Sequence, residues 1–356
     1  MAELWTRIQK TTITKHFRDV EENLMQNQVL TALMMKKGRV SYGHGGKNLD
    51  WPVLYARNSM SQYGDMQGVN FTRFNRHQTA TLDWRGYITG EQISKMEKLA
   101  NKGKEAIVRF TGNLVKMMED DIKYNFAAEL YKDGNATGRE HAIHGFKSWL
   151  GVTGSNRFTA PSDTYAGLST VLGNYGGSVQ SGSWPSGKMD PEYMFWSPII
   201  VNYTHADYGG TATWAANCKD ALRDGITFQS NAKGGKQGKL DVIVCTSSMY
   251  RDFLNTLDEK ERIIVDRGAQ NSELVALGFK GVVNFDGVDI TMDADCTDTQ
   301  AFGLNFDSLE LCSMQDQLFV PMTSEDHDTL TTKHTVDFFG NLKGNPRTTV
   351  LWDDIT

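Results

Sequence analysis

The sequence has few cysteines, and no two of them stand at the spacing of a metal or redox motif. Cys218, Cys245, Cys296 and Cys312 are the only four, and none forms a CxxC pair. A zinc ribbon and a thioredoxin-like site both need such a pair, so the sequence excludes them at the level of motifs. Four thiols in 356 residues fit a reducing cytoplasm, where they pack as small apolar groups.

Long apolar runs and an excess of basic charge are also missing. No stretch approaches the roughly 18 apolar residues of a membrane helix, and the start, MAELWTRIQK, lacks the apolar core of a secretory signal. We therefore expect no membrane partner. The 37 basic and 43 acidic residues give a net charge of -6. Tight electrostatic binding to nucleic acid needs a basic surface, so this balance disfavours such binding by the chain as a whole. It does not exclude a local basic face.

Recognisable catalytic and ligand-binding motifs are missing too. KGGKQGK departs from the phosphate-binding loop, because Lys233 replaces a glycine and Leu240 replaces the hydroxyl residue that binds magnesium. His141 and His144 lack a third metal ligand nearby, so we interpret them as turn or surface histidines. The aspartates of residues 286–298 lack the glycine and closing glutamate of a calcium loop, so we interpret them as solvated strand ends. The sequence therefore predicts no catalytic residue, no cofactor and no metal.

One segment that is present has the pattern of a long β-ribbon, over residues 51–88. VNFTRFN (69–75) and TATLDW (79–84) favour strands, and QYGDMQG (62–68) has the composition of a turn. Few apolar side chains fall on either face, and an isolated two-stranded ribbon is marginal in water. We therefore expect this ribbon to lie on something else.

The next segment, residues 89–133, has the pattern of one long helix. A Thr-x-x-Gln pair resembles a capping box at its start, no proline interrupts it, and Gly134 would end it. Apolar residues recur at spacings of three and four, which is the period of one helical face. The predicted packing face contains Ile93, Met96, Ile107, Phe110, Leu114 and Met117.

This helix would be unusually long for a compact chain. At 1.5 Å per residue, about 42 residues span roughly 60 Å, whereas a compact chain of this length is only about 50 Å wide. The pattern therefore suggests a flat, extended subunit. The alternative is a helix broken at Gly103 or Gly112, where glycine costs about 1 kcal/mol relative to alanine.

The remaining segments form two further regions. Residues 1–50 are interpreted as an arm with a helix over about 15–37, while 135–207 has the composition of loops. Helices over about 213–225 and after Ser247 or Ser248 alternate with short apolar strands. Those strands are LDVIVCT, GVVNF, VDITM, AFGLN and LELCS, and residues 332–351 again have a β pattern in which FFGNLKGNP forms a tight turn.

The order of these parts resembles the major capsid proteins of tailed bacteriophages, which have the Hong Kong 97-type fold. Each matching string is moderately specific by itself, and their common order carries the resemblance. The strings are LTALMMKKGRVSYGHGGKNLDWPVLYARNS (30–59), TLDWRGYITGEQISKMEKLANKGKEAI (81–107), LYKDGNATGREHAIHGFKSWL (130–150), VIVCTSSMYRDFLNTL (242–257), FKGVVNFDGVDITMDADCTDTQAFGLNFDSLEL (279–311) and VDFFGNLKGNPRT (336–348).

The resemblance implies an α+β fold in which an extended loop lies over a neighbouring subunit and gains strand partners there. Its implied parts are an N-terminal arm (1–48), an extended loop (49–88), a spine helix with a peripheral domain (89–207), an axial domain (208–319) and a return to the peripheral domain (320–356). The loop residues expected at the intersubunit contact are Tyr55, Arg57, Tyr63, Asp65, Met66, Phe71 and Arg73.

The resemblance also implies a structural role without catalysis. The chain would self-assemble into hexamers and pentamers of an icosahedral shell, in the bacterial host cytoplasm, and remain in the virion capsid. The shell would hold double-stranded DNA without sequence-specific contacts, and a portal would be a further partner. No built-in N-terminal scaffold is expected, so scaffolding would come from a separate protein. The crosslinking lysine and asparagine of one branch of the family cannot be placed in this sequence.

Two other functions fit parts of the sequence. An encapsulin-like cellular nanocompartment has the same fold but holds protein cargo, so particle contents would distinguish it. An α/β enzyme with a long helical spacer would form a small oligomer and show a deep pocket with perturbed titrating groups.

Overall fold

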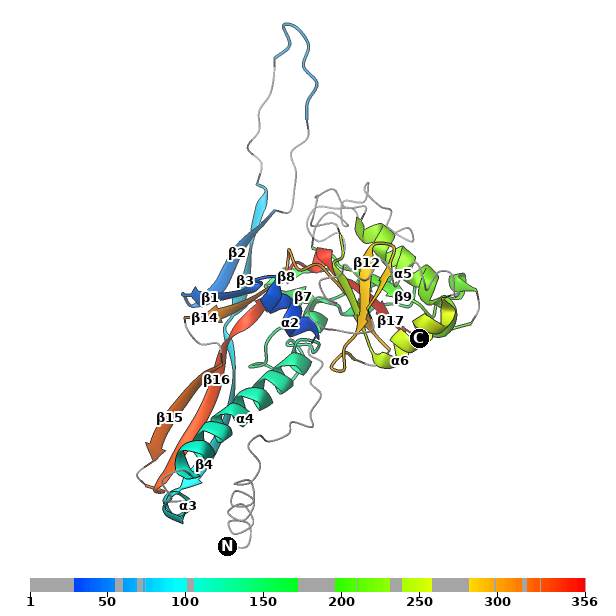
Figure 1. Cartoon of the computed structure of the whole chain (residues 1–356). Coiled ribbons are helices and arrows are strands. Elements are labelled where there is room, and N and C mark those ends of the chain that lie inside the picture. Colours follow the sequence, from blue (N-terminus) through cyan, green and yellow to red (C-terminus); the bar gives the residue numbers. More distant parts are fainter. Residues whose placement is uncertain are drawn as a thin grey trace.

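The computed structural model describes residues 29–54, 60–68, 73, 75–100, 106–171, 196–209, 211–230, 239–257, 282–297, 299–315, 319–326 and 328–355. They form an elongated molecule with a central body, from which a narrow ribbon projects in one direction and a sheet with a helix in the other (Figure 1). Across these ranges, no helix has the length and apolar character needed to cross a bilayer.

The body is built on a six-stranded sheet that is buried on both faces. Its strand order is β11-β12-β10-β13-β17-β9. Along β10, Ile243 and Cys245 pack with α5 and α6, while Val242 and Val244 face the second core cluster on the other side. Burial of both faces explains why β10 is a continuous apolar run rather than an alternating one. The elements are β9 (Ile199–Asn202), α5 (Trp214–Ser230), β10 (Val242–Cys245), α6 (Ser247–Thr256), β11 (Val283–Phe285), β12 (Val288–Met292), β13 (Ala301–Leu304) and β17 (Val350–Asp353).

Most predictions for this region are confirmed. The strings LDVIVCT, GVVNF, VDITM and AFGLN contain β10 to β13, and both helices are present. The N-cap of α6 is Thr246 instead of Ser247 or Ser248, because the Thr246 side chain accepts a hydrogen bond from the N–H of Met249. The four cysteines are free and buried, as expected of small apolar groups.

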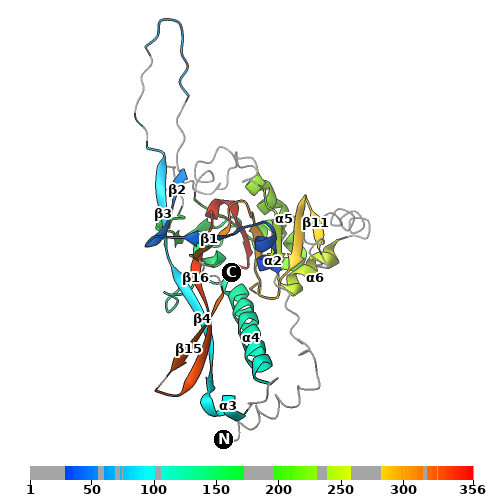
Figure 2. The same ribbon diagram turned by 60° about the vertical axis from the view of Figure 1, so that its left-hand side comes forward.

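A second, five-stranded sheet carries the ribbon and the long helix. The strand β16 (Thr331–Lys343) lies at its centre and pairs antiparallel with β14 (Glu310–Met314), β15 (Val320–Asp326) and β4 (Arg85–Ser94). The helix α4 (Ala106–Glu129) runs beside β4 and β16 (Figure 2). Phe126 of α4 packs edge-on against Phe338 of β16, with 4.7 Å between the ring centroids.

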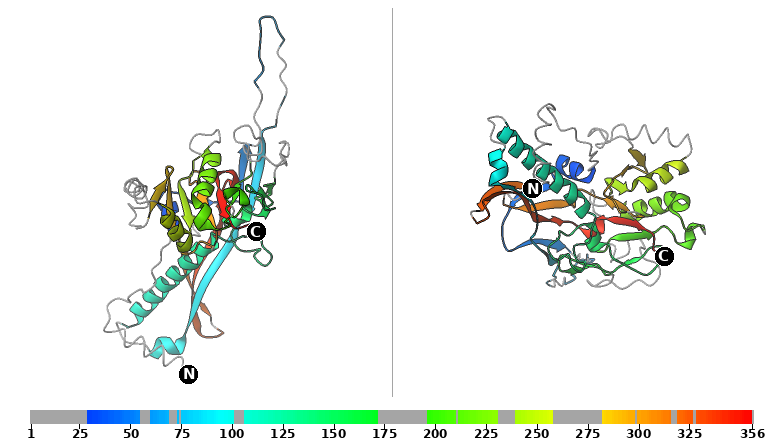
Figure 3. Two further views of the ribbon diagram at one scale, coloured as in Figure 1. Left: turned by 90° about the vertical axis from the view of Figure 1, so that its right-hand side faces the viewer. Right: turned by 90° about the horizontal axis from the view of Figure 1, so that it is seen from below.

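The long helix differs from its prediction at its start. Residues 85–94, which contain the expected capping box, form β4, and α3 (Lys95–Ala100) follows it. Strand pairing with β16 over ten residue pairs outweighs the local capping signal, because tertiary contacts override weak helix propensity. The helix α3 is not collinear with α4 (Figure 3). Gly112 lies within α4 and does not break it, whereas Gly103 is outside the described residues.

The helix α4 has 24 residues and so spans about 36 Å, shorter than the predicted spine. At the other end of the chain, FFGNLK belongs to β16. Only the residues after Lys343 form the turn into β17, so the predicted tight turn is shorter than expected. The strand β15 was not predicted, because its residues are mostly polar and exposed.

The segment 29–48, which was predicted to be part of an N-terminal arm, packs on the chain's own body. The strand β1 (Val40–His44) pairs in parallel with β14. The helix α2 (Val29–Lys36) packs on the chain's own core through Val29, Leu30, Leu33 and Met34. These apolar side chains are buried against other residues of the same chain, so the segment does not extend away from the body. Residues 1–28 of the predicted arm lie outside the described ranges.

Candidate assembly surfaces

The ribbon leaves the body from a firmly held root. The strand β2 (Asn48–Leu54) pairs antiparallel with β3 (His77–Asp83) over seven residue pairs. The indole N–H of Trp84 donates to the carbonyl of Gly46 at 3.1 Å. The side-chain amide of Asn341 donates to the carbonyl of Asp83 at 2.8 Å. These contacts set the direction in which the ribbon projects.

The far end of the ribbon exposes apolar side chains. Residues 60–68 lie at this end (Figure 1), where Met60 and Met66 are each 96% exposed and Tyr63 is 68% exposed. Met66 has a φ of +61°, in a tight turn where the N–H of Gln67 donates to the carbonyl of Gly64. Large apolar side chains held away from the body in this way are typical of an interaction surface.

The predicted loop contacts are only partly described. Tyr63, Asp65, Met66 and Arg73 are all exposed, so their side chains are free to meet another molecule. Tyr55, Arg57 and Phe71 lie outside the described residues.

The predicted packing face of the spine is corrected in part. Ile93 is buried, but from β4, and Leu114 is buried on α4. Met96 and Met117 are 74% and 59% exposed, because the predicted stripe was drawn across a strand–helix junction. The side chains of Ile107 and Phe110 are outside the description. The observed packing row of α4 runs at a spacing of four through Leu114, Met118, Ile122 and Phe126.

The five-stranded sheet has a face that sequence reasoning missed. Helix α4 covers the side of β4 and β16 that carries Ile93 and Phe338. We call the opposite side the outer face and define it by Ile88, Met322 and Phe339, which are 71%, 55% and 38% exposed. The Phe339 ring covers Gly86, where an added Cβ would come within 2.7 Å of the ring. The sequence RGYITGEQIS of residues 85–94 has no regular polar–apolar alternation, so no local signal indicated this face.

Several predictions about titratable residues are also settled. His141 is exposed, but His144 is buried, with its Nδ1 2.9 Å from the Asn341 amide, so it is not a surface histidine. Burial lowers the pKa of His144 to about 4, assisted by the charge of Arg85. Asp293, predicted to be solvated, is buried and accepts a hydrogen bond from the Tyr131 hydroxyl at 2.9 Å. Burial raises the pKa of both groups.

These perturbed groups have structural partners. Tyr131 joins the end of α4 to the end of β12, and His144 joins the following turn to β16. Arg85 has the same bracing role, since its guanidinium donates to the carbonyls of Gly134 and Ala142. The hydrogen bonds of Tyr131, His144 and Arg85 hold neighbouring elements of the fold together, so their perturbed pKa values give no reason to assign them to catalysis.

No protein-family model matches the sequence, and no curated protein matches it. Solved structures do resemble it over nearly its full length. The capsid asymmetric unit of cyanophage A-1(L) has a TM-score of 0.62 and 17% identity, covering 96% of each chain. The capsid of a native GTA particle has a TM-score of 0.61 and 11% identity, covering 95% of each.

The mature capsid of bacteriophage PhiM1 is also similar, with a TM-score of 0.50 and 13% identity. It covers 94% of this chain and 89% of the other. At such low identity the likeness concerns the fold. The predicted α+β, Hong Kong 97-like class agrees with this likeness and with the mixed sheets and helices described above. The chain therefore has the fold of phage capsid proteins.

Proposed function

We propose that this chain is the major capsid protein of a tailed bacteriophage. It acts as a structural protein without catalysis and assembles with copies of itself. Hexamers and pentamers of the chain build an icosahedral shell around double-stranded DNA. The observation that carries this proposal is the likeness to capsid proteins over about 95% of the chain, together with a ribbon whose apolar end has no cover in the subunit.

The parts of the fold take the roles implied by that likeness. The ribbon is the extended loop, α4 is the spine helix, and the five-stranded sheet belongs to the peripheral domain. The six-stranded sheet with α5 and α6 is the axial domain, which meets its copies at the centre of each ring. Three further limits then differ from the sequence prediction, because β9 and β17 belong to the axial sheet and β14 to the peripheral sheet. In addition, β1 and α2 belong to the body and not to an arm.

The ribbon makes the main intersubunit contact. Its side chains at this contact are Tyr55, Arg57, Tyr63, Asp65, Met66, Phe71 and Arg73. Covering apolar surface is worth roughly 25 cal/mol per Å², so Met66 and Tyr63 gain free energy on a neighbour that they cannot gain in the subunit. The outer face is a second intersubunit surface, because Ile88 and Met322 are large apolar side chains without cover. Many such contacts in a closed shell reinforce one another.

The remaining partners follow from the same role. A portal, a separate scaffolding protein and packaged DNA meet this chain, and assembly takes place in the bacterial cytoplasm before the shell becomes part of the virion. The net charge of -6 helps DNA to leave the shell, because a strongly basic lining would retain phosphate groups.

Negative-stain electron microscopy and sedimentation of the purified full chain test the proposal. We expect rings, shells or curved sheets to appear as concentration rises, since the subunit presents uncovered apolar surface. A chain that stays monomeric at every concentration, with and without proteins from its own phage, contradicts the proposal. Particles from the native source that contain protein cargo and no DNA would identify a cellular nanocompartment instead.

A further inference from the structure

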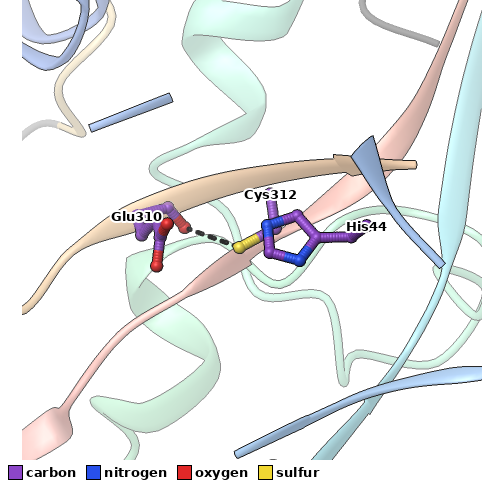
Figure 4. A group of neighbouring side chains, drawn as sticks. All are labelled: His44, Glu310 and Cys312. Carbon is purple, nitrogen blue, oxygen red and sulfur yellow. Dashed lines mark hydrogen bonds between the residues drawn. The ribbon is translucent and has the colours of Figure 1, made fainter. Parts of the chain in front are cut away.

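Three potential metal ligands meet where β1 lies beside β14. His44 comes from β1, and Glu310 and Cys312 come from β14, with the three side chains facing one another (Figure 4). One donor atom from each residue lies within 4.8 Å of the others. Cys312 is buried, while His44 and Glu310 are half-buried. No metal was predicted from the sequence, because β1 and β14 are far apart in the chain and no local motif joins their ligands.

An irregularity in β1 points His44 into the cluster. Ser41 pairs with Cys312 and His44 pairs with Met314, so β1 has one residue more than β14 between these pairs. Gly43 lies within this bulge and has a φ of +82°. In a regular strand, residues three apart face opposite sides, but here the Ser41 hydroxyl lies 2.7 Å from the His44 Nε2. Bulges often re-aim a side chain beside a functional site.

The strand β14 provides its two ligands without any irregularity. Glu310 and Cys312 are two residues apart in a regular strand and therefore share a face. The Ser41 hydroxyl also lies 3.5 Å from the Cys312 sulfur. Lys343 of β16 contacts the Glu310 carboxylate at 3.0 Å through Oε2. This contact keeps the carboxylate in place beside the sulfur.

We propose that His44, Glu310 and Cys312 bind one zinc ion. Thiolate, imidazole and carboxylate are the ligand types that zinc takes in proteins, whereas calcium and magnesium need more oxygen ligands than this cluster offers. The Ser41 hydroxyl or a water completes the tetrahedron. Binding deprotonates the thiol, so one proton leaves as the sulfur–zinc bond forms.

The geometry requires a small closure of the side chains. Zinc–ligand distances place tetrahedral donors roughly 3.5 Å apart. The donor atoms now lie within 4.8 Å of one another, so the widest spacing must shorten by up to about 1.3 Å. His44 and Glu310 have this freedom because both are half-exposed. The ion would join β1 to β14 beside the ribbon root, where the His44 and Trp84 rings lie 6.3 Å apart. It would therefore brace the point from which the ribbon projects.

Cobalt and zinc titrations of the full-length, reduced and chelator-treated protein test this proposal. We expect one cobalt ion per chain, with the near-ultraviolet charge-transfer absorption of a cobalt–thiolate bond, and zinc should displace it. Cys312→Ser should abolish that absorption. His44→Gln and Glu310→Gln should weaken binding by at least about tenfold, since even outer-shell partners of a metal have effects of that size.

Two control variants test whether the ion binds at this cluster and not at another thiol or imidazole of the chain. Cys218→Ser removes a buried thiol that contacts Thr256, and His141→Gln removes an exposed imidazole, so both should bind cobalt as the parent does. Absence of the thiolate absorption in the parent overturns the proposal, as does its persistence in Cys312→Ser. Unchanged affinity in both His44→Gln and Glu310→Gln, each with a folded circular-dichroism spectrum, also overturns it. Binding is measured without assembly, so the outcome is independent of the proposed capsid role.

Discussion

The six-stranded body and the ribbon differ in where their stabilising contacts come from. In the body, both sheet faces are covered by the chain's own residues. The Trp352 indole is buried, and its N–H donates to the carbonyl of Ala221 at 2.7 Å. In the ribbon, β2 and β3 pair with each other, while the far end exposes Met60 and Met66. One region is covered by the chain's own residues, and the other exposes apolar side chains that the proposed capsid role would cover with a neighbouring copy.

This difference has an energetic meaning. Burial of large side chains stabilises the body within a single chain, whereas a two-stranded ribbon is marginal in water. A subunit built this way can fold first and assemble later. Changes in the two regions should therefore have separable effects, on assembly in the ribbon and on unfolding in the body.

The largest expected effect comes from removing the end of the ribbon. Replacing residues 59–68 with a short Gly-Ser turn should give folded subunits that do not close into particles, because the contact with the neighbour is lost. Circular dichroism would check folding, and electron microscopy would check assembly. Normal shells from this variant would refute the role given to the loop.

The body should respond in the opposite way. Trp352→Ala should lower the free energy of unfolding of the subunit by about 3–5 kcal/mol, because it leaves a cavity beside Gly225 and Gly303. Denaturant unfolding would measure this change. The control is Met66→Ser, which should leave unfolding within about 0.5 kcal/mol of the parent and weaken assembly. Equal destabilisation by both changes would contradict the separation of the two regions.

Acid should weaken the body through His144. Its pKa is lowered to about 4 in the folded chain, chiefly by burial, while an unfolded histidine has a pKa near 6.5. Between these values the unfolded chain binds more protons, so stability is present above about pH 6.5 and is lost as pH falls toward 4. The slope should reach about 1.4 kcal/mol per pH unit. The free energy of unfolding, measured across this pH range, should change less with pH in His144→Gln than in the parent.

The smallest effect on the subunit should come from the outer face. Ile88→Glu places a charge on an exposed strand position, so the free energy of unfolding should change by less than about 0.5 kcal/mol. The concentration needed for assembly should rise about tenfold, equivalent to about 1.4 kcal/mol per contact. Gln92→Glu adds the same charge on the same face, away from the apolar side chains, and should have a smaller effect. If Ile88→Glu and Gln92→Glu raised the assembly concentration equally, the added charge and not the lost apolar contact would explain the effect.

Some elements were predictable because their signals are local. The run LDVIVCT predicts β10, since a strand buried on both faces is continuously apolar. The helix over about 213–225, observed as α5, and the helix after Ser247 or Ser248, observed as α6, were also predictable from local patterns. The resemblance implied that Tyr63 and Met66 lie at an intersubunit contact, and both are exposed in the subunit. These features depend on residues that are near neighbours in the chain.

Other elements could not be predicted because their partners are distant. Residues 85–94 carry a weak helix-capping signal, but their hydrogen bonds to β16 make them a strand. The polar strand β15 exists for the same reason. Met117 fitted a helical stripe, yet the true face of α4 is set by what Phe126 and Ile122 pack against.

The sequence alone was sufficient for the fold class, the apolar strands of the body and the absence of familiar catalytic motifs, because pattern, order and composition are properties of the chain itself. Tertiary structure decided that β1 and α2 belong to the body, that Ile88 and Met322 share an uncovered face, and that a bulge turns His44 toward Cys312. Each of those outcomes depends on which distant strands pair and in which register. Pairing energies between residues far apart in sequence leave no local pattern from which to predict them.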